Sequence, residues 1–391
     1  MPHGPDLFLL QLLLIFAAAK LCGEVFEQLR LPAVLGELLA GVVLGPHAVG
    51  WIEPTHSVEA MAGLGAIFLL FTVGLETHPD DLLQVGRQSL GVAAAGVAVP
   101  FVLGYAYFRW HGNATHESIF VATAMVATSV GITARVLGDM GVLQSRAARI
   151  ILAAAVFDDV LAMLLLAVVS GVAESGTVDW TSLGVLFVES AVFAIFMLFV
   201  APRLLHRVKH KLEGSRSSNA QLVIALLLCL GLSAAAERIG MAAIIGAFFA
   251  GLAMAPFAHE WRLDSRVGAI TEFLAPFFFF LLGAKLDLKL FTGDTLMVAL
   301  VVFLLAVISK VIGCGLPVWK EGRLTALQVG VGMTPRGEVG LIVALIGLKM
   351  GTISDTAYAV VMFMTAATTL LAPLGLRVLF RNESPIRPGP A

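Results

Sequence analysis

Long apolar segments separated by short polar turns run along the whole chain. Dividing the chain at its turn residues and charges predicts thirteen such segments, most of them close to the ~20 residues that a helix needs to cross a bilayer. They cover residues 6–29, 32–46, 58–76, 88–108, 117–139, 147–172, 181–203, 219–236, 241–256, 270–284, 294–316, 324–349 and 353–376. The pattern therefore predicts an all-α polytopic membrane protein with thirteen transmembrane helices.

Composition narrows the class of protein further. The 391 residues are 59% hydrophobic and only 13% charged, far from the balance of a soluble globular protein. A net charge of −2 gives no basic field for nucleic acid, and we find no zinc, P-loop or dinucleotide motif. The three cysteines, Cys22, Cys229 and Cys314, lie far apart inside apolar segments. We expect membrane lipids as surroundings, and no nucleic-acid partner, disulfide framework or cofactor.

The charges outside the segments predict an orientation. An odd number of segments places the two termini on opposite faces of the membrane. Most of the 25 Lys and Arg residues fall on the face that holds the 146–149 turn and the tail. The positive-inside rule therefore puts the N-terminus outside and the C-terminus in the cytoplasm. A linker helix and a basic cytoplasmic loop at 181–218 would separate two halves, 1–180 and 219–391.

The two halves resemble each other in sequence. Residues 34–46 (VLGELLAGVVLGP) match 244–256 (IIGAFFAGLAMAP) at an offset of 210, and 68–82 parallel 277–291 at an offset of 209. This offset spans seven segments, an odd number, so the second copy is upside down relative to the first. The sequence thus predicts two inverted six-helix repeats, as in secondary-transporter folds that place their sites at mid-membrane on broken helices.

Two segments are interrupted at corresponding places. Thr128–Gly131 in the fifth segment corresponds to Thr334–Gly337 in the twelfth at an offset of 206. Pro335 lacks a backbone donor, and glycine lowers the cost of leaving helical geometry. Non-helical backbone survives at membrane depth only where protein or water satisfies it. We therefore expect two crossed broken helices beside the charged residues of the sixth segment.

The sixth segment carries two adjacent carboxylates near its middle, Asp158 and Asp159. An aspartate at that depth costs at least ~2.5 kcal/mol on insertion scales, so the pair indicates a functional site. Adjacent helical positions point about 100° apart, so the two side chains must face different partners. Lys310 lies deep in the eleventh segment, where an ammonium needs a carboxylate. Asp158 is its expected partner, and snorkelling to an interface is the alternative.

Other charged residues are expected to brace the breaks. Arg336 and Glu338 would form an internal pair in the twelfth segment, and Arg135 and Asp139 would do the same in the fifth. The residues expected to support the site from the breaks are Gly131, Thr334, Pro335, Arg336 and Glu338. Glu37 and Glu76 lie near segment ends. The sequence does not decide whether each of these carboxylates is a structural cap or lies on the path of the ion.

These motifs resemble the bacterial sodium/proton antiporters of the cation:proton antiporter superfamily, NapA type, in the monovalent cation:proton antiporter 2 family. The resemblance covers nearly the whole length. It rests on GELLAGVVLGP (36–46), LFTVGLE (70–76), VATSVGITARVLGDMGVL (126–143), AAVFDDVLAM (154–163), Lys310 and VGMTPRGEVGLIVALIGLKMG (331–351). It implies the NhaA-like antiporter fold and a homodimer in the bacterial inner membrane.

The resemblance also implies roles. Segments 1–3 and 8–10 would form a dimerisation scaffold, and segments 4–6 and 11–13 a moving core. Asp159 would carry the ion, while Asp158 pairs with Lys310. Potassium-efflux relatives carry Gln-Asp where this chain has Asp-Asp, which favours sodium.

We therefore expect a secondary active transporter, not an enzyme, that exchanges Na⁺ or Li⁺ for H⁺ by alternating access and moves net charge. Carboxylate oxygens suit a hard cation, so Asp159 is the expected Na⁺ ligand and Asp158 a further one, aided by the Thr128 and Ser129 hydroxyls. The first alternative is a K⁺/H⁺ antiporter of the same fold. The second is a sodium-coupled organic-anion symporter, which needs a larger polar cavity. The third is an intramembrane aspartyl protease, which needs its two carboxylates on separate helices.

Overall fold

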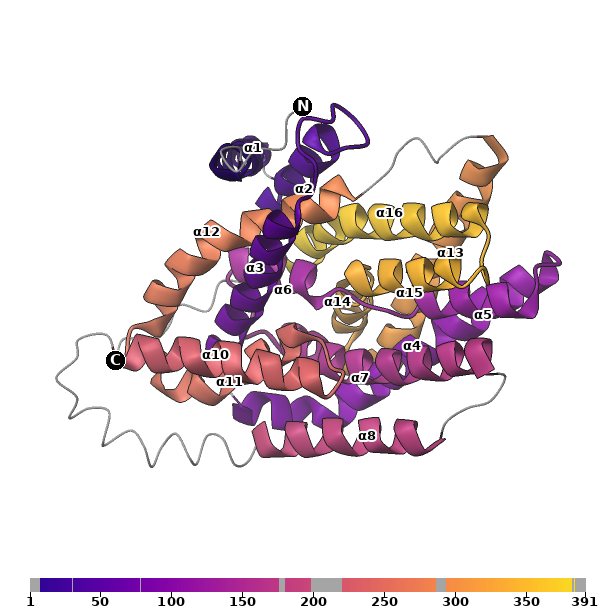
Figure 1. The fold of residues 1–391 in the computed structure, drawn as a ribbon. Coiled ribbons are helices and arrows are strands. Elements are labelled where there is room, and N and C mark those ends of the chain that lie inside the picture. Colours follow the sequence, from indigo (N-terminus) through magenta and orange to yellow (C-terminus); the bar gives the residue numbers. More distant parts are fainter. Residues whose placement is uncertain are drawn as a thin grey trace.

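Helices make up all the regular structure in the part of the chain that the computed structural model describes, residues 8–29, 31–77, 79–175, 180–197, 220–285, 293–381 and 383. Seven of these helices are long and apolar enough to cross a membrane. The elements are α1 (Phe8–Gln28), α2 (Ala33–Leu44), α3 (His56–Leu75), α4 (Pro79–Trp110), α5 (Thr115–Ala124), α6 (Val130–Asp139), α7 (Arg146–Ser175), α8 (Trp180–Ile195), α10 (Ala220–Arg238), α11 (Ala243–Ala258), α12 (Leu263–Ala284), α13 (Gly293–Gly315), the 3₁₀ turn η4 (Leu316–Glu321), α14 (Arg323–Gly332), α15 (Glu338–Lys349) and α16 (Asp355–Phe380). Figure 1 shows the helices in one bundle, with the axes of α7, α8, α10, α15 and α16 nearly aligned. The predicted all-α, multi-pass class is confirmed.

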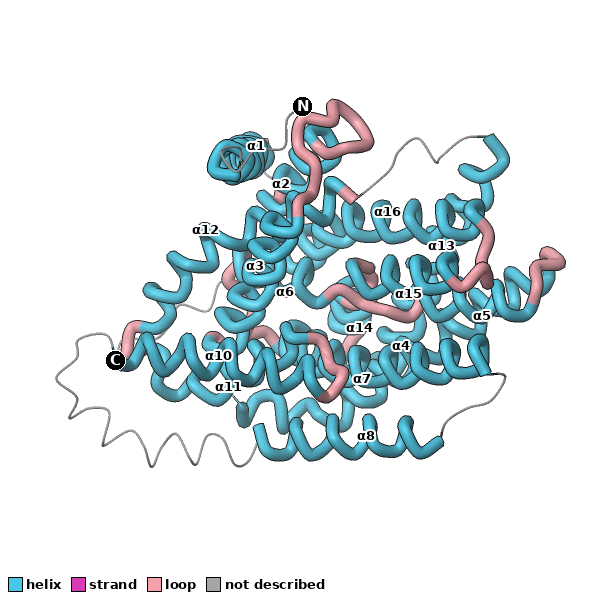
Figure 2. Tube along the Cα trace, in the orientation of Figure 1, coloured by secondary structure: helices cyan, strands magenta, loops and turns pink. Residues whose placement is uncertain are grey.

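Each of the two interrupted segments folds as a pair of short helices. The chain leaves helical geometry after α5 and resumes it at α6, and it does so again between α14 and α15. Figure 2 shows both connections as loops inside the bundle. Ser129 is extended, with φ −95° and ψ 97°, and Gly337 has φ −127° and ψ −138°. The chain therefore has four helix ends in its interior, where unpaired backbone groups need partners.

The helices pack in two groups. In the first group α3 lies against α11 and α12, α2 lies against α1 and α12, and α10 lies against α11. In the second group α4 lies against α7 and α13, and α16 lies against α13, α14 and α15. The groups meet where α6 lies against α2 and α3, and where α11 lies against α4.

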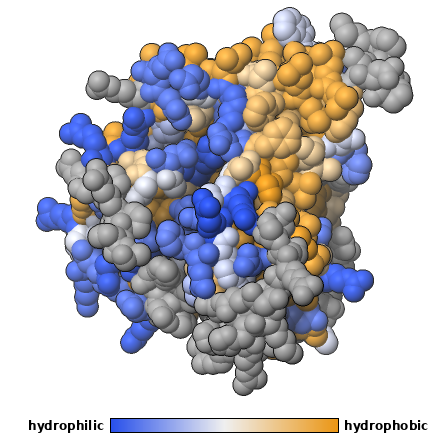
Figure 3. All heavy atoms as spheres, turned by 90° about the vertical axis from the view of Figure 1, so that its left-hand side faces the viewer, coloured by the Kyte–Doolittle hydropathy of each residue, from blue (hydrophilic) through white to orange (hydrophobic). Residues whose placement is uncertain are grey.

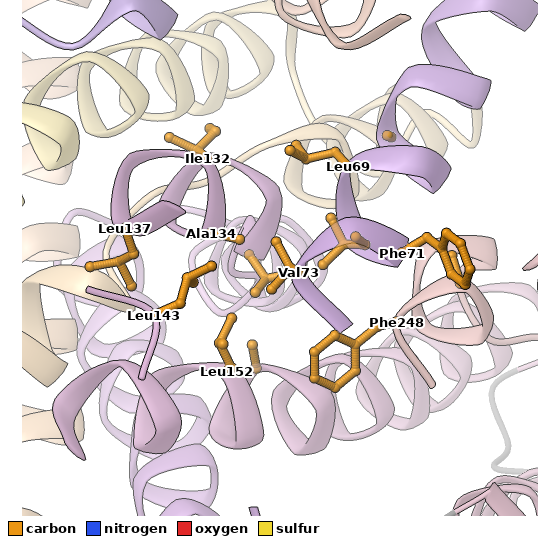
Figure 4. Packing of buried hydrophobic residues seen from close by; sticks show 14 of the residues in the cluster. Leu69, Phe71, Val73, Ile132, Ala134, Leu137, Leu143, Leu152 and Phe248 are labelled. Carbon is orange, nitrogen blue, oxygen red and sulfur yellow. The ribbon is translucent and has the colours of Figure 1, made fainter. Parts of the chain in front are cut away.

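An apolar interface joins the groups beside α6. Val73 of α3 and Phe248 of α11 lie close to Leu143 and Leu152 of the second group (Figure 4). All four side chains are buried in one hydrophobic cluster. Apolar contacts of this kind are non-directional, so they do not fix the register of one helix group on the other as hydrogen bonds would.

Glycines allow close backbone approach in the first group, and they do so in matching places. A Cβ at Gly36 of α2 would collide with the carbonyl of Cys22, and a Cβ at Gly246 of α11 would collide with that of Leu232. Both members of the second contact lie 210 residues after those of the first. Reciprocal contacts of the same kind join Gly41 to Phe280, Gly251 to Phe71, Gly283 to Leu38 and Gly74 to Phe248.

Some helix bounds differ from the predicted segments. α4 begins at Pro79, nine residues before the predicted start, because proline suits a first helical turn and the polar stretch that follows continues the helix beyond its apolar part. α2 has 12 residues, which is ~18 Å and short of a bilayer's hydrocarbon thickness. The basic loop at 203–219 and the end of the seventh segment lie outside the described residues.

The surface divides into polar and apolar areas. Figure 3 looks onto the left-hand end of Figure 1, where hydrophilic residues gather beside a broad hydrophobic area. Large apolar side chains are exposed on the flanks, among them Leu9 at 75%, Trp110 at 89% and Val378 at 74%. Exposed apolar surface of this extent is typical of a protein whose flanks face lipid.

Candidate functional site

Asp158 and Lys310 form a buried ion pair between α7 and α13. Lys310 Nζ donates to Asp158 Oδ1 at 3.1 Å, and both residues are 0% exposed. Oδ2 of Asp158 has no hydrogen-bond partner among the described residues. Gly96 of α4 lies beside the pair: a Cβ there would lie 2.6 Å from Cys314 Sγ and 3.4 Å from Lys310 Nζ. Gly96 was not predicted from the sequence, although a glycine in the middle of a long apolar helix is a recognisable signal of close packing.

Asp159 faces a different side of α7, towards the first helix group. It is 9% exposed and contributes to a narrow cavity of about 10 Å³, which has room for about one water molecule. The other lining residues are apolar and come from α3, α6, α7 and α11: Leu70, Val130, Leu152, Ala155, Val156, Ile244, Ile245 and Phe248. Adjacent carboxylates on one helix therefore lie in different surroundings, one paired with an ammonium and the other at the interface of the two helix groups.

The two breaks meet each other directly. The backbone N–H of Ser129 donates to the carbonyl of Pro335 at 2.7 Å, and Thr128 Oγ1 donates to the carbonyl of Met333 at 3.3 Å. A Cβ at Gly337 would lie 2.7 Å from Ser129 Oγ, so glycine is needed for this approach. The crossing satisfies backbone groups that the breaks release.

Hydroxyls reinforce the crossing. Thr133 Oγ1 donates across the crossing to the carbonyl of Gly332 at 2.6 Å, whereas Thr334 Oγ1 donates within its own segment to that of Gly330 at 2.9 Å. Thr128 and Ser129 stand at the break just before Val130, which lines the cavity of Asp159. Neither Thr128 nor Ser129 is among the residues that line the cavity: Thr128 donates to a carbonyl of the other break, and Ser129 Oγ faces Gly337.

Arg336 braces the crossing through carbonyls. Its guanidinium, 0% exposed, donates twice to Met125 at 3.0 and 2.7 Å, once to Thr334 at 2.9 Å and once to Ala306 at 3.1 Å. Met125 caps the carbonyl end of α5, where the helix dipole favours a cation. Thr369 Oγ1 of α16 donates to the carbonyl of Arg336 at 2.5 Å, a contact that the sequence analysis also missed.

The expected Arg336–Glu338 pair stays a prediction, because the side chain of Glu338 lies outside the described part of the structure. Glu338 is the first residue of α15. In the other break, Arg135 Nε donates to Asp139 Oδ2 at 3.1 Å, as the sequence predicted. This pair lies at the far end of α6 from the cavity of Asp159.

A second and wider cavity of about 470 Å³ lies between the helix groups. Its walls come from α3, α12, α15 and α16 and from the chain between α2 and α3. They include Phe278, Leu282, Leu341, Tyr358 and Met362, with His47, Glu59 and Lys285 as polar members. We call it the wide cavity. Phe278, which lines the wide cavity, also lies near the break: a Cβ at Gly131, next to Val130, would lie 3.6 Å from Phe278 and 3.7 Å from Leu70, which lines the narrow cavity.

Comparisons with known proteins agree with this geometry. A family model described as "Sodium/hydrogen exchanger, transmembrane" matches residues 13–382. The chain is 32% identical to the high-affinity Na(+)/H(+) antiporter NhaS3 of Synechocystis sp., over 98% of this chain and 92% of that one. It is also 32% identical to the Na(+)/H(+)-K(+) antiporter GerN of Bacillus cereus, over 95% and 96% of the two chains.

A solved structure shows the same fold. The sodium proton antiporter MjNhaP1 from Methanocaldococcus jannaschii superposes with a TM-score of 0.71 over 99% of this chain and 100% of that one, at 17% identity. A likeness at this identity concerns the fold, and the family rests on the match that covers residues 13–382. The chain therefore belongs to the transmembrane sodium/hydrogen exchanger family, whose members are transporters and not enzymes.

Proposed function

We propose that this protein exchanges Na⁺ or Li⁺ for H⁺ across a membrane, with Asp159 as the carboxylate that both ions occupy in turn. One observation carries the proposal. Lys310 balances the charge of Asp158 inside the second helix group, whereas Asp159 faces a cavity at the interface between the groups. Relatives named as Na⁺/H⁺ antiporters support the choice of ions.

Competition for one carboxylate makes the exchange obligatory. A carboxylate that has bound a proton no longer offsets the charge of a cation, so each ion must leave before the other binds. Asp159 would supply oxygen to the cation, with the Thr128 and Ser129 hydroxyls and freed carbonyls of the break as neutral ligands. The narrow cavity of about 10 Å³ favours a single small ion over an organic anion.

We further propose that the fold consists of thirteen spans in two inverted six-helix repeats. The reciprocal glycine contacts support a two-fold relation, because α2 and α3 meet α12 and α11 through matching residues about 210 positions apart. In this arrangement 1–180 is the first repeat, 181–218 the linker, and 219–391 the second repeat with a short tail. α1–α3 and α10–α12 would form the scaffold, and the second helix group the moving core.

The same proposal places the protein in the bacterial inner membrane as a homodimer formed by the scaffold, with the N-terminus outside and the C-terminus in the cytoplasm. The distribution of Lys and Arg supports the orientation. The core would then move along the apolar interface of α3, α6, α7 and α11 and expose Asp159 to each side alternately.

The ion pair favours an electrogenic cycle. When a cation draws Asp158 away from Lys310, a buried ammonium without a counter-charge gives its proton to water. Cation entry then releases one proton from Asp159 and one from Lys310, and both return when the cation leaves. Two protons move for each Na⁺, so each cycle transfers one net charge.

K⁺/H⁺ exchange by the same site is the second candidate, because one relative is named a Na(+)/H(+)-K(+) antiporter. Proton flux in proteoliposomes with Na⁺, Li⁺ and K⁺ in turn distinguishes the two. Flux driven by Na⁺ and Li⁺ supports the first proposal, and flux driven by K⁺ at similar concentrations supports the second. Absence of flux with all three cations would refute both.

A further inference from the structure

Glu37 of α2 is a buried carboxylate outside the site described above. The residue is 1% exposed, and its Oε2 is out of reach of solvent and has no hydrogen-bond partner among the described residues. A buried polar atom without a partner costs ~1–3 kcal/mol, and more when it is charged. Such an atom in a folded protein needs an explanation other than packing.

Charged residues of both helix groups contribute to the electrostatic environment of Glu37. Lys20 and Glu27 of α1 act on it from the first group, and Arg135 and Asp139 of α6 act on it from the second. Arg135 is already bound to Asp139 at 3.1 Å. Glu37 Cγ lies beside α1, 3.7 Å from where a Cβ of Gly23 would stand, and α2, which carries Glu37, also packs against α6 at the boundary of the two groups.

One helix links Glu37 to the site. α6 begins at Val130, which lines the cavity of Asp159, and ends at Asp139, nine residues or ~13 Å further along its axis. Between these ends the interface is filled by apolar side chains, with Ala134 of α6 near Val73 of α3 and Leu137 of α6 near Leu143 (Figure 4). Glu37 therefore lies beyond this closure, on the side where α6 ends.

Packing alone does not require a carboxylate at this place. The corresponding residue of the second half, 210 positions later, is Ala247 of α11, which is 0% exposed. The helix pairs α1–α2 and α10–α11 meet through the matching glycines Gly36 and Gly246. An equivalent helix contact thus forms around an alanine, and the carboxylate belongs to one side of the site only.

We propose that Glu37 is a second ion-exchanging carboxylate on the transport path, which binds a proton or a monovalent cation between Asp159 and the membrane face where α6 ends. The inference rests on the proposed function, under which that face is cytoplasmic. Movement of α6 carries the Arg135–Asp139 pair past Glu37 and opens the apolar closure. Glu37 then releases its proton to water and binds the entering cation, and it takes up a proton again when the cation moves on to Asp159.

The test compares Na⁺ KM values from the two faces in oriented proteoliposomes. Glu37→Gln keeps the shape of the side chain but removes proton exchange and charge. We expect it to raise the KM for Na⁺ about fivefold or more at the face where α6 ends, with the KM at the opposite face unchanged. Glu37→Asp should keep the parent KM on both faces.

A matched control is Glu59→Gln, which removes an exposed carboxylate of the wide cavity. It should leave the KM at the α6 face unchanged. Equal KM changes on both faces in Glu37→Gln, or no change on either face, would overturn the proposal, since a merely structural carboxylate does not distinguish the faces.

A second readout does not depend on flux. Dicyclohexylcarbodiimide modifies protonated carboxyl groups in apolar surroundings. It should therefore label Glu37 of the purified protein, and saturating Na⁺ or K⁺ should protect Glu37 from the reagent. Peptide mass spectrometry measures the labelling and the protection. Absence of labelling, or labelling that no cation reduces, would overturn the proposal. Cation-sensitive labelling in a protein without cation-driven proton flux would instead refute the proposed exchange and keep Glu37 as a cation site.

Discussion

Lys310 Nζ lies 3.1 Å from Oδ1 of Asp158, and solvent reaches neither side chain. The neighbouring residue, Asp159, lies instead at the interface of the two helix groups, in a cavity with apolar walls. The pair is therefore internal to the group formed by α4–α7 and α13–α16, so movement of that group as one body does not by itself separate the two side chains. This arrangement assigns different roles to two carboxylates that are adjacent in the sequence.

Asp158→Asn should destabilise the protein strongly. The substitution leaves the Lys310 ammonium buried without a counter-charge, and breaking a buried pair from one side costs ~3–5 kcal/mol. Thermal unfolding in detergent should therefore occur at a clearly lower temperature than in the parent. Combining Asp158→Asn with Lys310→Gln removes the unpaired charge and should restore most of the loss. A single variant that unfolds like the parent would contradict the role of the pair.

Alanine at the reciprocal glycines should weaken the first helix group. A Cβ at Gly41 or Gly251 collides with backbone of the facing helix, so we expect Gly41→Ala and Gly251→Ala each to cost ~1–3 kcal/mol of stability. The matched controls are Gly231→Ala and Gly268→Ala, where nothing lies within 4 Å and alanine should stabilise the helix by ~0.5–1 kcal/mol. Similar unfolding temperatures for both sets would refute the close approach of these helices.

Much of the site could be predicted from the sequence because its signals are local. Asp158, Asp159 and Lys310 are conspicuous as charges in apolar segments, and Pro335 with its neighbouring glycines marks a break. The partner of Arg336 was not predictable in this way. Its guanidinium donates to backbone carbonyls, which every residue possesses, so no side chain in the sequence identifies the contact.

The cavity of Asp159 could not be predicted from the sequence either. Leu70 and Phe248 line it, and they are indistinguishable in the sequence from other residues of apolar helices. Only the way in which α3, α6, α7 and α11 come together around the cavity selects them. The same holds for Glu37, which the sequence left open and whose burial depends on how α1 and the other helices pack around α2.

Phe278 should control access from the wide cavity to Asp159. We expect Phe278→Ala to speed the reaction of a cysteine at Ala155, which lines the narrow cavity, with a small cationic thiol reagent added from the side of the wide cavity. Phe279→Ala is the matched control, because Phe279 is buried next to it at a ring distance of 5.0 Å and contributes to neither cavity. The background protein would carry substitutions of all three native cysteines. Equal rates in the two variants would show that Phe278 is not the barrier.

Membrane potential should drive the exchange. A potential is worth about 2.3 kcal/mol per charge per 100 mV, so a cycle that moves one net charge can extrude Na⁺ without a pH gradient. The measurement is Na⁺ efflux from proteoliposomes at equal pH on both sides under a potential set by valinomycin. Exchange that is otherwise intact but indifferent to voltage would rule out the two-proton cycle and leave Lys310 as a structural counter-ion.

The central claim is that one carboxylate, Asp159, binds the cation and the proton in turn. Asp159→Asn tests it most directly, because the amide has nearly the same shape but neither exchanges a proton nor balances a cation. The measurement is Na⁺-driven proton flux in proteoliposomes, with thermal unfolding of the same preparation as a check on folding. The account predicts that flux falls to the level of protein-free vesicles while the unfolding temperature stays close to that of the parent. Sustained Na⁺-driven flux in the folded variant would contradict it.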